Sequence, residues 1–104
     1  MFLNLGKAHL IFSLLVLAGL PMSLFSRSAQ EIYKAGCAAC HDSGIAGAPM
    51  MGNKGQWKLR EAKGYEMLVN NAYNGINGMP AKGLCADCTK EEIGRAVQFM
   101  LDTI

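Results

Sequence analysis

Two cysteines and a histidine stand close together in the sequence and are the residues best suited to hold a cofactor. Cys37 and Cys40 are separated by two alanines, and His41 follows directly, which gives the pattern C-x-x-C-H. This pattern is typical of covalent haem attachment. Residues three apart lie on the same face of a helix, so both thiols can reach one edge of a porphyrin. His41 would then lie under the ring, where an imidazole nitrogen can bind the iron.

Two other uses of the cysteines fit the sequence less well. A thioredoxin-like redox pair is expected within a β-α-β pattern, which this sequence lacks. A zinc site needs four ligands, and the two C-x-x-C pairs can supply them in principle. Zinc, however, leaves His41 and the Gly- and Met-rich segment after it without a role. We therefore predict one covalently bound haem c.

A second axial ligand has to approach the iron from the face opposite His41. Among the seven methionines, Met67 and Met100 lie at apolar positions of expected helices, where we expect their sulfur atoms to fill the core. The remaining candidates lie in loops. They are Met50, Met51 and Met79.

The distance along the chain separates these three candidates. Met50 and Met51 follow His41 so closely that a loop can only just carry them around the haem edge. Met79 follows an intervening helix and stands between a glycine, which permits close backbone approach, and a proline, which stiffens the chain. Met79 is the predicted second axial ligand.

Histidine and methionine together leave the iron no position for a substrate or for oxygen, and a thioether ligand favours ferrous iron. This ligand set predicts a single-electron carrier between respiratory redox proteins and not an enzyme, since no further histidine follows His41 to serve as a distal acid or base. The alternative is a haem-based sensor in which Met79 dissociates and the iron binds a small molecule.

Helices are the elements expected to position these residues. Hydrophobic periodicity predicts a helix from Ala29 to Cys40 that ends near His41. Glycine, proline and serine indicate loops over 42–55 and 74–83. Further helices are expected over 56–62, over 65–73 and after the capping box that begins at Thr89. No alternating run long enough for a sheet is present, so the fold class is all-α.

The first 28 residues have the character of an export segment. No charged residue lies between Lys7 and Arg27, and the apolar run in this interval follows a lone positive charge. We expect residues 1–28 to be a signal peptide cut after Ser28 or an uncleaved membrane anchor, and residues 29–104 to form the domain. The first four residues from Ser28 also form a capping box, which favours an earlier cut or an anchor. The expected location is the periplasm. Charges after Ser28 balance, and no basic stripe suggests nucleic acid.

The second cysteine pair, Cys85 and Cys88, is followed by Thr89 in place of a histidine, so no second haem is expected there. A disulfide would close a very small loop and contribute about 2 kcal/mol in the chain-entropy model. A redox-active dithiol is the alternative, although nothing basic nearby would lower a thiol pKa.

Two stretches of the sequence, EIYKAGCAACHDSGIAGAPMMGNKGQW and AYNGINGMPAKGLCADCTKEEI, resemble the cytochrome c5 family of small bacterial class I c-type cytochromes. The resemblance covers essentially residues 31–101. It implies a haem attached through Cys37 and Cys40, with His41 and Met79 as axial ligands.

The same resemblance assigns three further roles. It implies that the Pro49 carbonyl orients His41, that Trp57 packs near the haem propionates, and that Cys85 and Cys88 form a disulfide.

Overall fold

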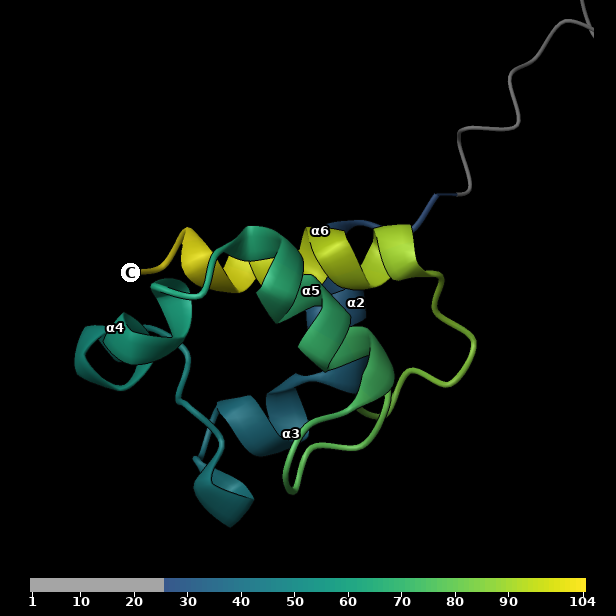
Figure 1. The fold of residues 1–104 in the computed structure, drawn as a ribbon. Coiled ribbons are helices and arrows are strands. Elements are labelled where there is room, and N and C mark those ends of the chain that lie inside the picture. The colour runs from purple at the N-terminus through teal and green to yellow at the C-terminus, as the bar shows by residue number, and fades with distance from the viewer. Residues whose placement is uncertain (1–25) are drawn as a thin grey trace, which may run out of the picture.

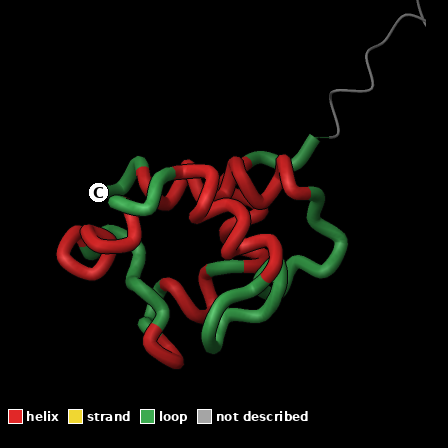
Figure 2. Tube along the Cα trace, in the orientation of Figure 1, coloured by secondary structure: helices red, strands yellow, loops and turns green. Residues whose placement is uncertain are grey.

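A computed structural model describes residues 26–104, and the predicted export segment lies almost wholly outside them. The described part consists of short helices joined by turns (Figures 1 and 2). The elements are α2 (Ala29–Gly36), α3 (Ala38–His41), the 3-10 turn η2 (Ile45–Gly47), α4 (Lys54–Glu61), α5 (Tyr65–Asn74) and α6 (Lys90–Leu101). Over residues 26–104 there is no strand, and the prediction of an all-α fold is confirmed. Within the same range, no helix has the length and apolar character needed to cross a membrane.

Both α2 and α6 begin with a capping box. Before α2, the Ser28 hydroxyl accepts from the backbone N–H of Glu31, and the Glu31 carboxylate accepts from the N–H of Ser28. Thr89 and Glu92 make the same reciprocal pair at the start of α6. Each box satisfies backbone N–H groups that a helix start leaves without partners.

The core lies where α6 packs against both α2 and α5. Ile32 of α2 is 1% exposed, and it meets Leu68 and Val69 of α5 and Ile93, Ala96 and Val97 of α6. A second cluster joins Tyr33, Trp57 and Met100. Figure 1 shows α6 and α2 along one side of the molecule, α4 at one end, and α3 on the opposite side. The C-x-x-C-H segment, most of which forms α3, therefore lies across the molecule from α6.

The expected single helix over 29–40 is in fact two helices that meet at Cys37, whose φ of −123° is not helical. The cause is a long-range hydrogen bond. The Gly36 carbonyl accepts from the Leu84 N–H at 2.9 Å, while the Cys40 N–H turns to the Cys37 carbonyl. In a continuous helix the Gly36 carbonyl would accept from Cys40 instead.

Two smaller expectations are also corrected. The loop predicted over 42–55 contains the η2 turn, and α4 begins at Lys54 because the Asn53 side chain accepts from the Gln56 N–H and caps the helix two residues early. Met67 was expected in the core but is 50% exposed, since α5 turns Leu68 and Val69 inward instead.

Arg27 and Ser28 form part of the folded unit. The Arg27 guanidinium binds the Glu92 carboxylate at 2.7 Å and the Asp87 carboxylate at 3.3 Å, and its carbonyl accepts from Arg95. The hydrogen bond from Arg27 lowers the pKa of Glu92 to about 2. Arg27 therefore contacts α6, and Ser28 caps α2.

Candidate cofactor site

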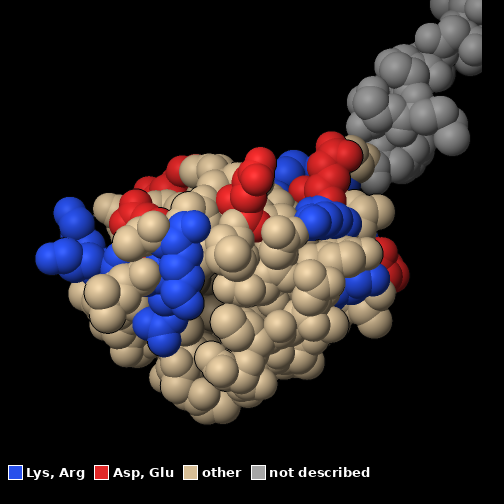
Figure 3. Space-filling model, viewed as in Figure 1, with Lys and Arg blue, Asp and Glu red and all other residues tan. Residues whose placement is uncertain are grey.

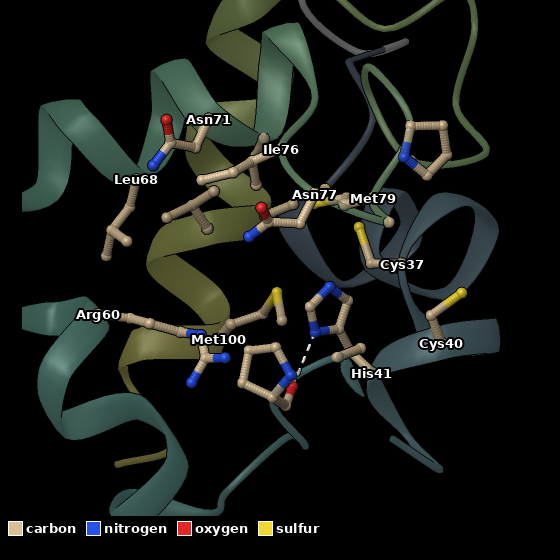
Figure 4. Close-up of a pocket in the computed structure, with 18 of the residues that line it drawn as sticks. Cys37, Cys40, His41, Arg60, Leu68, Asn71, Ile76, Asn77, Met79 and Met100 are labelled. Atoms are coloured by element: carbon tan, nitrogen blue, oxygen red, sulfur yellow. Dashed lines mark hydrogen bonds between the residues drawn. The ribbon is translucent and has the colours of Figure 1, made fainter. Parts of the chain in front are cut away.

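A cavity of about 530 Å³ lies between α3, α4, α5 and α6. The η2 turn with the two residues after it, and the loop around Met79, complete its walls (Figure 4). Most of the lining side chains are apolar, which suits a large hydrophobic ligand. The cavity brings together Cys37, Cys40, His41, Pro49, Trp57 and Met79, all of them predicted site residues.

His41 is held in one orientation at the wall of this cavity. The ring is 8% exposed, and its Nδ1 lies 2.8 Å from the carbonyl oxygen of Pro49. A carbonyl only accepts, so Nδ1 carries the hydrogen and Nε2 keeps a free lone pair. The Trp57 ring stacks against the imidazole, with centroids 6.0 Å apart and planes 23° apart. His41 is therefore oriented and in the tautomer that can bind a metal through Nε2.

Trp57 is fixed in turn by its own hydrogen bond. Its indole N–H donates to the Met50 carbonyl at 2.9 Å, and the ring is 6% exposed. The Met51 N–H donates to the His41 carbonyl at 2.7 Å. The segment after His41 thus folds back on it, and its two methionines act through their backbone while their side chains lie outside the cavity lining.

Cys37 and Cys40 stand beside His41 as half-buried free thiols (Figure 4). Burial raises the pKa of the Cys37 thiol to about 11. A zinc ligand or a redox-active dithiol has to be a thiolate, and this environment disfavours one. The thiols do suit covalent attachment, because both line the same cavity as the imidazole.

Met79 approaches the cavity from a tight turn. The backbone groups of Ile76 and Met79 bond to each other at 2.9 and 3.0 Å, which closes the turn. In Figure 4, Met79 and His41 extend into the cavity from separate chain segments. Gly75 permits this turn at a φ of 88°, where a side chain would meet the Met79 carbonyl at 3.0 Å.

Met100 is the other methionine that lines the cavity. It is 5% exposed and packs in the cluster with Tyr33 and Trp57, as expected of a core sulfur. Met50, Met51 and Met67 do not line the cavity. Apart from the two cysteine thiols, the sulfur atoms in the cavity wall therefore belong to Met79 and Met100.

Large apolar side chains stand at the rim of the cavity. Ile45, Leu59 and Leu84 line it while remaining 59%, 81% and 63% exposed. Exposed apolar groups of this size need a reason in a small domain. Around a site for a flat hydrophobic ring, they can contact the ring edge and shield it from water.

The second cysteine pair lies outside the cavity. Cys85 and Cys88 are joined in a disulfide and are 5% and 2% exposed. The Cβ of Cys85 packs against Gly36, directly before the first cysteine of the C-x-x-C-H motif. The disulfide therefore supports the turn on which that motif begins, and its sulfur atoms are not available to a zinc ion.

Apart from Trp57, the residues that α4, α5 and α6 contribute to the cavity wall were not predicted as site residues. Leu68 and Asn71 of α5 and Ile93, Val97 and Met100 of α6 line the cavity. The apolar periodicity of α6 indicates a buried face, but it does not distinguish residues that line the cavity from residues packed in the core. Arg60 of α4 and Lys63, which follows that helix, also line the cavity.

Comparison with known proteins gives one consistent family. Residues 26–100 match the family described as "Cytochrome C oxidase, cbb3-type, subunit III". The chain is 43% identical to cytochrome c5 of Ectopseudomonas mendocina over 77 residues, which cover 72% of this chain and 88% of that protein. It is 36% identical to cytochrome c-555 of Chlorobaculum tepidum over 99 residues, 91% of this chain and 92% of that protein.

Solved structures agree with these relatives. A mono-heme ferrocytochrome c from Shewanella putrefaciens superposes with a TM-score of 0.65 at 43% identity, covering 72% of this chain and 93% of that one. A chain in the crystal structure of an electron transfer complex of nitrite reductase with cytochrome c gives a TM-score of 0.69 at 29% identity, covering 75% of this chain and 95% of that one.

Proposed function

The chain belongs to the small class I c-type cytochromes, and on that premise we propose that His41 and Met79 are the axial ligands of its haem iron. As a member of this family it binds one covalent haem c and carries single electrons. The observation that carries the assignment of ligands is the oriented His41, with Nε2 free, in the same apolar cavity as Met79.

The residues around the cavity have separable roles in this proposal. The haem supplies one-electron chemistry at its iron, and Cys37 and Cys40 anchor it through thioether bonds. Pro49 and Trp57 hold the His41 ring in place by a hydrogen bond and by stacking. Two strong-field protein ligands on a rigid frame leave no open iron position, so the site transfers electrons and does not transform a substrate.

The expected partners are electron donors and acceptors of a respiratory chain. One structural neighbour is a cytochrome c seen in a complex with nitrite reductase, which supports partners that are redox proteins. We place the protein in the periplasm, because residues before Arg27 have the composition of an export segment. The exported chain, whether soluble or tethered by that segment, should keep Arg27 and Ser28, since both contribute contacts to α2 or α6.

Carbon monoxide distinguishes the carrier from the haem-based sensor. We expect the purified reduced protein to keep its absorption spectrum under carbon monoxide, because Met79 occupies the position that the gas would need. Rapid conversion of the wild type to a carbon monoxide complex would favour a sensor, in which Met79 dissociates.

A further inference from the structure

The short helix α3 carries Cys40 and His41 but has few contacts with the rest of the fold. It packs mainly against α2 and η2. Within residues 26–104 the ion pairs join Arg27 or Arg95 to carboxylates in or near α6, and none of them involves α3. The lower part of the face in Figure 3, where Figure 1 shows α3, carries no charged side chain. The direction of α3 must therefore be set by other contacts.

The break at Cys37 removes the simplest of these contacts. A continuous helix through α2 and α3 would fix the direction of α3 by its backbone alone, but the Cys37 φ of −123° ends that continuity. The angle between α2 and α3 then depends on bonds that cross the break.

One side-chain hydrogen bond crosses it. The Tyr33 hydroxyl of α2 donates to Asp42 Oδ1 at 2.5 Å, and Asp42 is the C-cap of α3, directly after His41. In a continuous helix, two residues 9 positions apart would lie on opposite faces and about 14 Å apart along the axis. The bond can form only because the chain turns at Cys37, and it holds α3 at one angle to α2.

Tyr33 is itself held firmly on the α6 side of the molecule. Its ring is 5% exposed and packs in the cluster with Trp57 and Met100. The ring centroid lies 5.6 Å from that of Phe99 in α6, with the planes 56° apart. Asp42, in contrast, is exposed. The hydroxyl therefore connects the buried cluster to the end of α3, and without Asp42 a polar group at the edge of the core would lose its acceptor.

We propose that Tyr33 is a positioning residue for the axial ligand, because through Asp42 it sets the direction of α3 and so the place of His41 against the haem. The proposal rests on the function given above. Pro49 and Trp57 fix the His41 ring about its own bonds. Tyr33 instead fixes the helix from which that ring extends. The direction of the imidazole plane relative to the haem depends on both.

The test compares five forms of the haem-loaded protein. Tyr33→Phe removes the hydroxyl and keeps the ring, Asp42→Ala removes the acceptor, and Asp42→Asn keeps an acceptor oxygen without the charge. Tyr65→Phe is the matched control. Its hydroxyl also donates between two elements, to the Gly94 carbonyl at 3.0 Å, but it joins α5 to α6 and lies outside the cavity lining.

Two signals are recorded for each form in the oxidised state. The proton NMR shifts of the haem methyl groups depend on the direction of the axial ligand planes, so they report the orientation of His41. The sulfur-to-iron charge-transfer band reports whether Met79 stays bound. Loss of stability alone, which both tyrosine variants should show, moves neither signal.

We expect Tyr33→Phe and Asp42→Ala to change the methyl shift pattern in the same sense with the sulfur-to-iron band kept, and Asp42→Asn and Tyr65→Phe to keep the wild-type pattern. The proposal is overturned by an unchanged pattern or a lost band in Tyr33→Phe, by an equal change in Tyr65→Phe, or by an Asp42→Asn pattern as altered as that of Asp42→Ala. If Tyr33→Phe does not acquire haem, Asp42→Ala takes its place under the same criteria. A wild type without covalent haem or without the sulfur-to-iron band would instead overturn the proposed function itself.

Discussion

Replacing Gly36 with alanine tests how the disulfide turn supports the haem-attachment motif. An ideal Cβ at this position would lie 2.7 Å from the Cβ of Cys85 and 3.2 Å from its backbone nitrogen. The Gly36 carbonyl also accepts from Leu84 at 2.9 Å, so α2 and the turn cannot separate without stretching that bond. Gly36 is helical, so space and not backbone conformation decides the outcome.

The magnitude follows from two opposing terms. Overpacking of this kind costs about 1–3 kcal/mol. Alanine in place of glycine in a helix contributes up to about 1 kcal/mol in the other direction. Because Gly36 is the last residue of α2, little of this helix-interior gain applies, and the net loss should be about 1–2 kcal/mol. With a urea dependence of about 1 kcal/mol per molar for a small domain, the unfolding midpoint should fall by about 1–2 M.

The assay is urea unfolding of the haem-loaded protein, followed by circular dichroism and by haem absorption in parallel. Gly55→Ala in α4 is the matched control, because its Cβ would meet only the Asn53 side chain, at 3.6 Å. We expect this control to hold or gain stability. An unchanged or raised midpoint for Gly36→Ala would refute the inferred contact, and so would an equal loss in the control.

Three further predictions concern the ligand, the disulfide and the N-terminal contact. Met79→Ala should remove the sulfur-to-iron charge-transfer band and lower the reduction potential, whereas Met51→Ala should leave both unchanged. The opposite pattern would show that Met79 is not the ligand. Cys85→Ser should still carry covalent haem by mass spectrometry but unfold about 2 kcal/mol more easily. Because Arg27 holds the pKa of Glu92 near 2, that pair stabilises the fold above pH 4–5 and the gain is lost as pH falls toward about 2. Arg27→Gln should therefore be less stable than wild type at neutral pH but differ little near pH 2, and an equal difference at both pH values would contradict this.

Local signals predicted most of the helices and the main site residues. Capping boxes place the starts of α2 and α6, and apolar periodicity selects the buried face of α6. The C-x-x-C-H motif identifies Cys37, Cys40 and His41 without any information on tertiary structure. Such features depend on residues within about two turns of one another, and sequence patterns report these directly.

Features that depend on distant contacts could not be predicted in this way. The break at Cys37 follows from the hydrogen bond between Gly36 and Leu84, which lie far apart in the sequence. The inclusion of Arg27 in the domain depends on carboxylates near α6. The direction of Arg60 into the cavity depends on where α4 packs, which no local pattern fixes.

The most direct test of the central claim is the absorption spectrum of the purified exported protein, oxidised and reduced. A haem bound by His41 and Met79 predicts a low-spin spectrum with a sulfur-to-iron charge-transfer band in the oxidised form and sharp bands in the reduced form. A high-spin spectrum without the sulfur band, or a preparation without haem absorption, would contradict it.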